Sequence, residues 1–294
     1  MKKTVIALSI ACVCGFTSCS NDEEVDNSYK EVKIITSVSG TTKAAIDPVT
    51  GGGNLENGDK ILLLADKLPH TISFSDYTIG SSKLHWDNLI SGDYSGTQWS
   101  EDFLLALGEP PYDFIAYYPN VTFWQIAIDG FNAATATNPD LLGAKIAGVA
   151  KGGTVYLTFN HLMHKLVVSL SSNDYTESEL SSATVGLKNL FSTASVNYTD
   201  ATINYASASG TDAYPHKQGA STSLIVAPQN LPAVGTDLIE ITLNGKTFTY
   251  KIPTGLTILE SGKMLTFNLN LKKGSGVVED TGSDYSQGGG ISWN

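Results

Sequence analysis

The sequence contains no arginine and only three cysteines. All eighteen basic residues are lysines, and they face 29 acidic residues, so the formal net charge is −11. An acidic chain repels the phosphates of nucleic acid and the headgroups of anionic lipid. Nucleic acid is therefore not expected as a partner.

The N-terminal segment has the pattern of a secretory signal. Lys2 and Lys3 precede an apolar run, "VIALSIACVCGF", at residues 5–16. A helix needs about twenty residues to span a bilayer, so this run is too short for a membrane span, but it has the length of a signal. We therefore exclude it from the fold.

The end of this signal, "FTSC", resembles the lipobox of bacterial lipoproteins. The resemblance implies that residues 1–18 are a signal peptide, cut between Ser18 and Cys19, and that Cys19 is then acylated. The alternative is an ordinary signal peptide in which the cysteine occurs by chance. Cys12 and Cys14 lie within the signal, so an acylated Cys19 leaves no free thiol for a disulfide, a metal or catalysis.

An acidic stretch follows the lipobox, and we interpret residues 19–30 as a tether. Several acyl chains anchor a protein stably where one does so only marginally. The stretch resembles the signal that sends some outer-membrane lipoproteins to the cell surface; its residues are Ser20, Asn21, Asp22, Glu23 and Glu24. The alternative is a tether that is acidic only because it is solvated.

From residue 28 onward the chain reads as short strands and turns. Apolar residues alternate or form short runs, and no long amphipathic pattern with a period of 3.6 is found. Asn244-Gly245, flanked by alternating residues, predicts a type I′ hairpin. The fold class predicted is all-β, with β-sandwiches. The clearest predicted strands are 31–40, 60–66, 113–119, 154–159, 165–170, 223–228 and 264–272, and residues 238–253 form the hairpin.

The domain organisation predicted is two sandwiches with a boundary near residue 150. The stretch "AKGGT" is the most linker-like sequence between two apolar blocks. The expected units are an N-terminal sandwich at 31–150, a C-terminal sandwich at 151–273 and a Gly/Ser-rich tail at 274–294.

Enzyme and metal signatures are missing from the sequence, and no cofactor is expected. His161 and His164 are three apart, which on one strand would point them to opposite faces, so structural roles are favoured over a shared metal. The loop 47–59 lacks the spacing of a calcium loop and reads as a solvated turn. Three tryptophans offer a sugar-stacking surface or, as the alternative, ordinary packing: Trp86, Trp99 and Trp124.

Six short stretches in order resemble one family, the fimbrillins, which are precursors of protease-matured pili on certain Gram-negative anaerobes. The stretches, together with the lipobox, run through nearly the whole chain. They are "GTTKAAIDP" (40–48), "NGDKILLLA" (57–65), "DFIAYYPN" (113–120), "DLLGAK" (140–145), "VYLTFNHLMHKLVVSL" (155–170) and "LIVAPQNL" (224–231).

The resemblance implies two transthyretin-like β-sandwich domains and a mode of assembly. Family precursors are exported as lipoproteins to the outer membrane and the cell surface. A protease then cuts after a basic residue, the N-terminal strand leaves, and a strand from a neighbouring subunit takes its place in the fimbrium. The partners implied are other fimbrial subunits bound by strand addition, a maturation protease, the outer membrane bound through lipid, and a receptor on a host or bacterial surface.

The sequence departs from the family at the cleavage site. Well-studied members are cut after arginine, which this chain lacks, and Lys43 stands where the basic residue would be. We therefore expect cleavage between Lys43 and Ala44 by a protease that accepts lysine. Lys30 and Lys33 are rival sites, and a solvated loop lysine is the alternative reading of Lys43.

The C-terminal tail holds a candidate donor strand. In "GGGISWN", Ile291 and Trp293 are two residues apart, so on a strand they would anchor one face. The alternative is a disordered tail with a chance aromatic. The function predicted is an adhesive fimbrial subunit without enzymatic activity, and the alternative is a resident surface lipoprotein that binds glycans through exposed aromatics.

Overall fold

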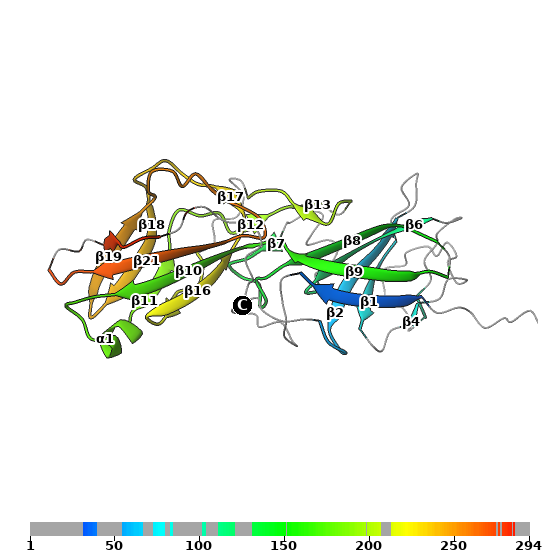
Figure 1. Cartoon of the computed structure of the whole chain (residues 1–294), viewed down its shortest axis with the longest axis horizontal. Coiled ribbons are helices and arrows are strands. Elements are labelled where there is room, and N and C mark those ends of the chain that lie inside the picture. The colour runs from blue at the N-terminus through cyan, green and yellow to red at the C-terminus, as the bar shows by residue number, and fades with distance from the viewer. Residues whose placement is uncertain are drawn as a thin grey trace, which may run out of the picture.

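The computed structural model shows a chain that is almost entirely β (Figure 1). Among the residues that the structure describes, the helical part is one short helix, α1 (Glu177–Ser181). No helix in this part of the chain is long and apolar enough to cross a membrane. The described residues are 32–39, 55–66, 73–79, 83–84, 102–103, 111–120, 131–150, 152–197, 199–206, 213–274, 276, 278–283 and 285.

The first half of the chain builds a six-stranded sheet in the order β1-β9-β8-β6-β2-β3. β1 runs parallel to β9, and the other neighbours are antiparallel. The strands are β1 (Lys33–Val38), β2 (Lys60–Asp66), β3 (Ser73–Thr78), β6 (Tyr112–Tyr118), β8 (Leu142–Val149) and β9 (Thr154–His161).

The second half builds two four-stranded sheets, with orders β16-β10-β21-β22 and β15-β11-β18-β19. In the first of them β10 pairs parallel with β21 and antiparallel with β16. The strands are β10 (His164–Ser171), β11 (Thr184–Leu187), β15 (Lys217–Gln218), β16 (Ser221–Val226), β18 (Asp237–Leu243), β19 (Lys246–Lys251), β21 (Met264–Leu271) and β22 (Val278–Asp280).

Short two-stranded pairs complete the described chain. β7 pairs with β12, which joins a segment of the first half to one of the second. The strands of these pairs are β4 (Lys83–Leu84), β5 (Asp102–Phe103), β7 (Phe131–Asn132), β12 (Thr193–Ala194), β13 (Val196–Asn197), β14 (Thr202–Ile203), β17 (Gln229–Asn230) and β20 (Ile258–Leu259).

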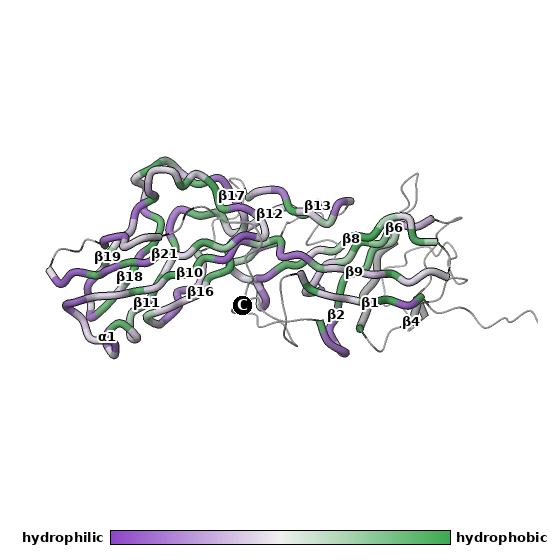
Figure 2. The backbone as a smooth tube through the Cα atoms, viewed as in Figure 1, coloured by the Kyte–Doolittle hydropathy of each residue, from purple (hydrophilic) through white to green (hydrophobic). Residues whose placement is uncertain are grey.

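The hydrophobic pattern of each strand matches its place in a sheet. β9 and β21 alternate strictly between buried and more exposed residues, as the period of two predicts. β2 instead buries all of Ile61–Ala65, because both of its faces are covered. Figure 2 shows the apolar stretches along the strands, interrupted by hydrophilic ones.

The predicted hairpin at Asn244-Gly245 is confirmed. β18 and β19 pair antiparallel with Leu243 opposite Lys246, which leaves a two-residue turn. Asn244 has a φ of 50° and Gly245 a φ of 74°. Positive φ at both central residues is the requirement of a type I′ turn, and Asn and Gly adopt it at low cost.

Two hydrophobic clusters hold the described residues together. The first cluster contains the inward residues of β1 and β9 and the residues on one face of β2, β6 and β8. The second cluster contains the core of the second half and also Leu62, Leu64, Ile115 and Tyr117, which lie on the opposite face of β2 and β6. The six-stranded sheet therefore contributes to both clusters.

The sheet pairing bears on the domain boundary expected near residue 150. β8 and β9 lie on either side of this point, yet they pair antiparallel through Leu142↔His161 and Gly143↔Asn160. The "AKGGT" stretch thus lies at a turn within one sheet, and the chain passes to the next sheet at Leu162 and Met163, after β9. The division into two sandwich domains stays a prediction.

Candidate functional site

The residues that the sequence assigned to processing and assembly lie outside the described part of the chain. They are Ser18, Cys19, Ser20, Asn21, Asp22, Glu23, Glu24, Lys43, Ala44, Ile291 and Trp293, and the three candidate sugar-stacking tryptophans lie outside it as well. What the structure does describe is β1, the strand that precedes Lys43, and the place where it binds.

β1 is the terminal strand of the six-stranded sheet in the described chain. Its parallel ladder with β9 runs from Lys33↔Thr154 to Val38↔Phe159. The amide of Ser39 extends the pairing by donating to the carbonyl oxygen of Phe159 at 2.8 Å. In Figure 1, β1 lies alongside β9.

The ladder of β9 depends on β1 over most of its length. β9 pairs with β8 only through His161 and Asn160, at its C-terminal end. Over Thr154–Phe159, the partner found in the described chain is β1. We call this edge of β9, with the inward side chains beside it, the seat of β1. Loss of β1 would leave the backbone groups of the seat without their partners.

The two faces of β1 differ in burial. Val32, which precedes the strand, is 2% exposed and Val38 is 5% exposed, and Ile34 packs against the same first cluster. Cross-strand partners share a face, so these residues point inward beside Val155, Leu157 and Phe159, which belong to the same cluster.

The opposite face of β1 is open to solvent. Lys33, Ile35 and Ser37 are exposed. Ile35 stands opposite Tyr156 of β9, and both belong to the large hydrophobic side chains that are exposed in the described chain, at 37% and 57%. Ser37 donates a long hydrogen bond of 3.3 Å to Thr158. β1 is thus held through one edge and one face.

The two histidines singled out in the sequence lie on different strands, β9 and β10, and both are buried. His161 Nδ1 lies 2.8 Å from Asp140 Oδ2, a hydrogen-bonding partner that the sequence pattern did not reveal because it is 21 residues away. Burial raises the pKa of Asp140, against the opposing effect of His161. No group of three metal-ligating side chains is found among the described residues.

His164 sits at the start of β10 with its ring fully buried. Its Nδ1 lies 2.8 Å from the backbone oxygen of Glu260 and donates to it. Burial lowers the pKa of His164 to about 4, because the charged imidazolium would lose its hydration there. The two histidines therefore have separate partners, which indicates structural roles.

Gln229, in the stretch that resembles the family's "PQ" motif, is fully buried, and its side chain forms hydrogen bonds with two backbone segments. Its amide nitrogen donates to the backbone oxygens of Phe191 and Ala227, and its amide oxygen accepts from the Phe191 N–H at 2.8 Å. The hydroxyl of Tyr214 donates to the same Phe191 oxygen and accepts from the Ala227 N–H. This motif therefore organises the core.

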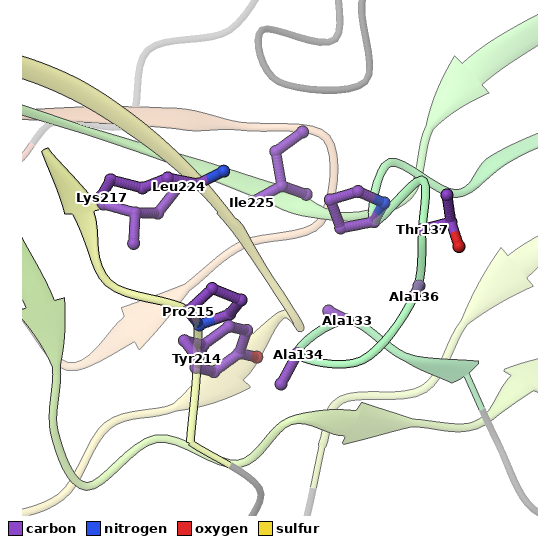
Figure 3. Close-up of a pocket in the computed structure, with 10 residues that line it drawn as sticks. Ala133, Ala134, Ala136, Thr137, Tyr214, Pro215, Lys217, Leu224 and Ile225 are labelled. Atoms are coloured by element: carbon purple, nitrogen blue, oxygen red, sulfur yellow. The ribbon is translucent and has the colours of Figure 1, made fainter.

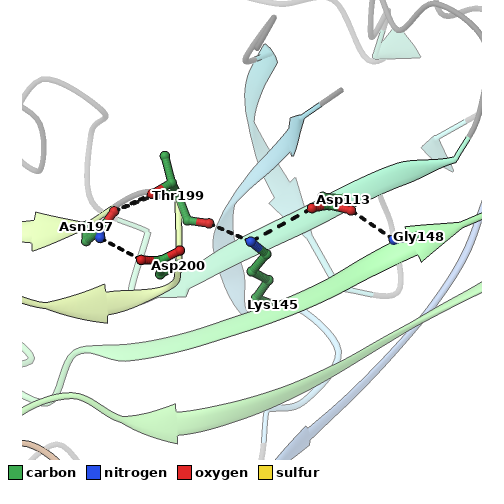
Figure 4. Close-up of polar contacts among 6 residues, drawn as sticks. All are labelled: Asp113, Lys145, Gly148, Asn197, Thr199 and Asp200. Carbon is green, nitrogen blue, oxygen red and sulfur yellow. Dashed lines mark hydrogen bonds and ion pairs between the residues drawn. The ribbon is translucent and has the colours of Figure 1, made fainter. Parts of the chain in front are cut away.

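A polar network ties the β13–β14 hairpin to the six-stranded sheet (Figure 4). Lys145 Nζ of β8 donates to the backbone oxygen of Thr199 at 2.8 Å and lies 3.8 Å from Asp113 Oδ2 of β6. The hydroxyl of Tyr117 donates to the Asn197 oxygen at 2.8 Å, and burial raises its pKa. These contacts join the two halves of the sequence.

A small cavity of about 140 Å³ lies beside β16 (Figure 3). Apart from Lys217, its lining side chains are uncharged, and the Tyr214 hydroxyl already has two hydrogen-bond partners. This lining is more typical of a gap in the packing than of a catalytic centre. The lining residues are Ala133, Ala134, Ala136, Thr137, Pro139, Tyr214, Pro215, Lys217, Leu224 and Ile225.

The segment that leads to the C-terminal tail is pinned to the second half. β22 pairs antiparallel with the end of β21, from Leu269↔Asp280 to Leu271↔Val278. The hydroxyls of Tyr250 and Tyr285 both donate to the carboxylate of Asp280. The ring of Tyr285 also packs against Phe267. β22 and Tyr285 are thus both held against the second half of the chain.

Comparison with solved structures shows that other proteins share this fold. Among solved structures, a candidate cell adhesion protein from Bacteroides uniformis is 20% identical, with a TM-score of 0.57 over 87% of this chain and 98% of that one. A second, from Bacteroides ovatus, is 19% identical, with a TM-score of 0.56 over 88% and 98%. At such identities the likeness shows the shared fold alone.

A search of curated proteins finds no match. A family model does match: the model described as fimbrillin-like covers residues 42–284, which is most of the chain. The family resemblance seen in six short stretches is thereby confirmed. This chain belongs to the fimbrillin-like family.

Proposed function

We propose that this protein is a subunit of a cell-surface fimbria that serves adhesion. The observation that carries the proposal is the fimbrillin-like family match across residues 42–284. The fold shared with candidate cell adhesion proteins from two Bacteroides species supports it. A structural subunit of a fimbria requires binding surfaces and strand pairing, and it does not require a catalytic centre.

The proposed route to the surface uses the N-terminal segment. Export as a lipoprotein would acylate Cys19 and attach the precursor to the outer membrane, and residues 20–24 would direct it to the outer face. The support is the order of charged, apolar and small residues before Cys19 and the acidic stretch after it.

The proposed assembly step is the exchange of β1 for a strand of another subunit. A cut between Lys43 and Ala44 would separate β1 from the rest of the chain, since β1 ends at Val38. Among the described residues, β1 is then held by its ladder with β9 and by one apolar face. A strand from a neighbour would restore both, through main-chain hydrogen bonds and alternate side chains.

The geometry of β1 favours Lys43 over the rival site Lys33. Lys33 is the first residue of β1, so a cut after it would leave Ile34–Val38 attached to the mature chain. The seat would then stay occupied. Cleavage at Lys43 empties the whole seat, which is what strand addition requires.

The test is the N-terminus of the protein taken from the cell surface, read by intact mass and peptide sequencing. We expect a chain that begins at Ala44 without lipid, and polymers that form only after cleavage. Lys43→Gln should block both, leaving an acylated monomer. Lys33→Gln is the matched control, because it removes an exposed lysine ten residues earlier and should leave processing intact. A surface protein that still begins at acylated Cys19 would contradict the assembly step.

A further inference from the structure

The chain passes from the six-stranded sheet to the second half through a short buried segment. We call residues 162–165 the crossing. Leu162 and Met163 are buried in the second cluster, and His164 and Lys165 begin β10. The turn at residues 260–263, which comes directly before β21, lies against this segment. We call this turn the clamp.

Each residue of the crossing has its own hydrogen-bond partner in the clamp. The four bonds are Ser261 Oγ–H to the Leu162 oxygen at 2.8 Å, the Gly262 N–H to the Met163 oxygen at 2.9 Å, His164 Nδ1–H to the Glu260 oxygen at 2.8 Å, and the Lys165 N–H to the Lys263 oxygen at 2.9 Å. The partners are far apart in the sequence, so these bonds depend on the folded arrangement.

Gly262 lets the clamp approach the crossing closely. Its φ is 68°, and a Cβ atom at this position would lie 2.8 Å from the backbone oxygen of His161. A side chain here would therefore meet both an unfavourable φ and a steric clash with backbone. The close fit requires glycine.

The crossing is also bonded to the first half of the chain. The Leu162 N–H donates to the Leu141 oxygen at 2.8 Å, and His161 contacts Asp140. Asp140, His161 and Lys165 are the ionisable residues of two stretches that carried the family resemblance, 140–145 and 155–170. All three are buried at this point. The crossing is thus held from both halves.

His164 is the member of this set that a proton can disturb. Its Nδ1 donates to the clamp, and its Nε2 is buried and finds no hydrogen-bond partner among the described residues. A proton on Nε2 would create a charged donor in a site without an acceptor or water. The imidazolium would then be stabilised by leaving the site, which breaks its bond to Glu260.

We propose that the clamp is a proton-sensitive conformational device. Near neutral pH it holds the two halves together at the crossing, and protonation of His164 releases it while the sheets on either side stay folded. The clamp lies within a single chain, so it can hold or release whether or not the protein assembles into fimbriae.

The direction of the pH effect follows from the burial of His164. Burial lowers its pKa from 6.5 to about 4, whereas the ring is hydrated in the released crossing. The released state binds the proton more readily, so release grows as pH falls from about 6.5 toward 4. Between pH 7 and pH 5 the equilibrium constant for release should rise about twentyfold.

The other ionisable groups around the crossing do not share this role. β16, which pairs with β10 at His164, carries no ionisable side chain. Burial raises the pKa of Asp140, so its proton is held more tightly in the closed state and it opposes release in acid. The remaining groups on the crossing, on the clamp and next to them are His161, Lys165, Glu260 and Lys263.

The first experiment measures amide hydrogen exchange of the full chain at pH 7 and pH 5, corrected for the intrinsic exchange rates. The amides of Gly262 and Lys165 report release, and the β18–β19 hairpin is the internal reference. Opening at the two reporters should rise about twentyfold relative to the hairpin. In His164→Asn, which does not titrate, the rise should be less than about threefold. An equal rise in the variant, or an equal rise in the hairpin, would overturn the proposal.

The second experiment tests the clamp without altering His164. At pH 7, Gly262→Ala should speed exchange of the Lys165 amide by about tenfold, because the added Cβ clashes with the His161 oxygen. Gly255→Ala is the matched control, since its φ is also positive, at 94°, and no atom lies within 4 Å of its added Cβ. It should change that exchange by less than about twofold. Equal effects of the two variants would overturn the proposal.

The outcomes are separate from those of the proposed function. Exchange is measured on the chain before assembly, so a clamp that behaves as expected in a protein that never polymerises would contradict only the fimbrial role. Polymerisation of a chain in which Gly262→Ala and Gly255→Ala behave alike would contradict only the clamp.

Discussion

β1 and β10 both pair in parallel with a neighbouring strand, but they differ in how many partners they have and in how deeply they are buried. β1 pairs with β9 over Lys33–Val38, and β10 pairs with β21 over Lys165–Ser171. β10 has a second, antiparallel partner in β16, whereas β1 has β9 alone among the described strands. Removal of β10 would break two ladders, and removal of β1 would break one.

The side chains repeat this contrast. In β10, Leu166 and Val168 are fully buried and belong to the second cluster. In β1, exposed and half-buried residues alternate, and only Val38 is buried within the strand. The lesson is that pairing alone does not fix a strand; a second partner strand and a fully buried apolar face do so.

The largest effect that would test this contrast is on the free energy of unfolding. Leu166→Ala in β10 should cost about 3 kcal/mol, because it leaves a cavity in a closed core. Ile34→Ala in β1 should cost only about 1 kcal/mol, since the side chain is half-buried and the edge can adjust. Urea unfolding of both variants gives the comparison, and equal losses would show that β1 is as firmly built in as β10.

A second effect concerns pH at the start of β10. Burial holds the pKa of His164 at about 4, below its usual value, so the unfolded chain binds this proton more readily than the folded one. Stability from His164 is therefore full above about pH 6.5 and is lost as pH falls toward 4, by up to roughly 3 kcal/mol.

The variant that isolates this effect is His164→Asn. An asparagine amide can donate to the Glu260 oxygen as the ring Nδ1 does, but it does not titrate. Urea unfolding between pH 7 and pH 4 should show a smaller loss of stability in the variant than in the parent chain. Equal losses of stability in the two proteins would mean that His164 does not contribute to the pH dependence of unfolding. Asp140 is present in both proteins, so its contribution cancels.

The smallest effect tests how firmly the sheet of β1 is tied to the second half. Tyr117→Phe in β6 removes the hydroxyl that donates to the Asn197 oxygen and should cost about 1 kcal/mol. Tyr156→Phe, on the exposed face of β9, is the control and should cost nothing measurable. If the two variants were equally stable, the contact at Asn197 would not contribute to the tie.

Local patterns in the sequence predicted much of this fold. The alternation in β9 and β21 and the Asn244-Gly245 turn were readable because each depends on residues that are close in the chain. The Asp140–His161 pair was missed, because no local pattern reports a partner 21 residues away. The turn after residue 150 resembled a linker, but glycines serve both roles, and only the pairing of β8 with β9 separates them.

The sequence by itself determined the all-β class and the order of motifs that the family match confirms. It also contains the secretory signal pattern and a lysine, in place of arginine, at the expected cleavage position. Only the tertiary structure decided that β1 is paired in parallel with β9 at the edge of its sheet, and that Thr36 faces Leu157. The physical reason is range. Periodicity and turn chemistry arise between neighbours, whereas register, edge position and burial arise between β1 and a strand about 120 residues away.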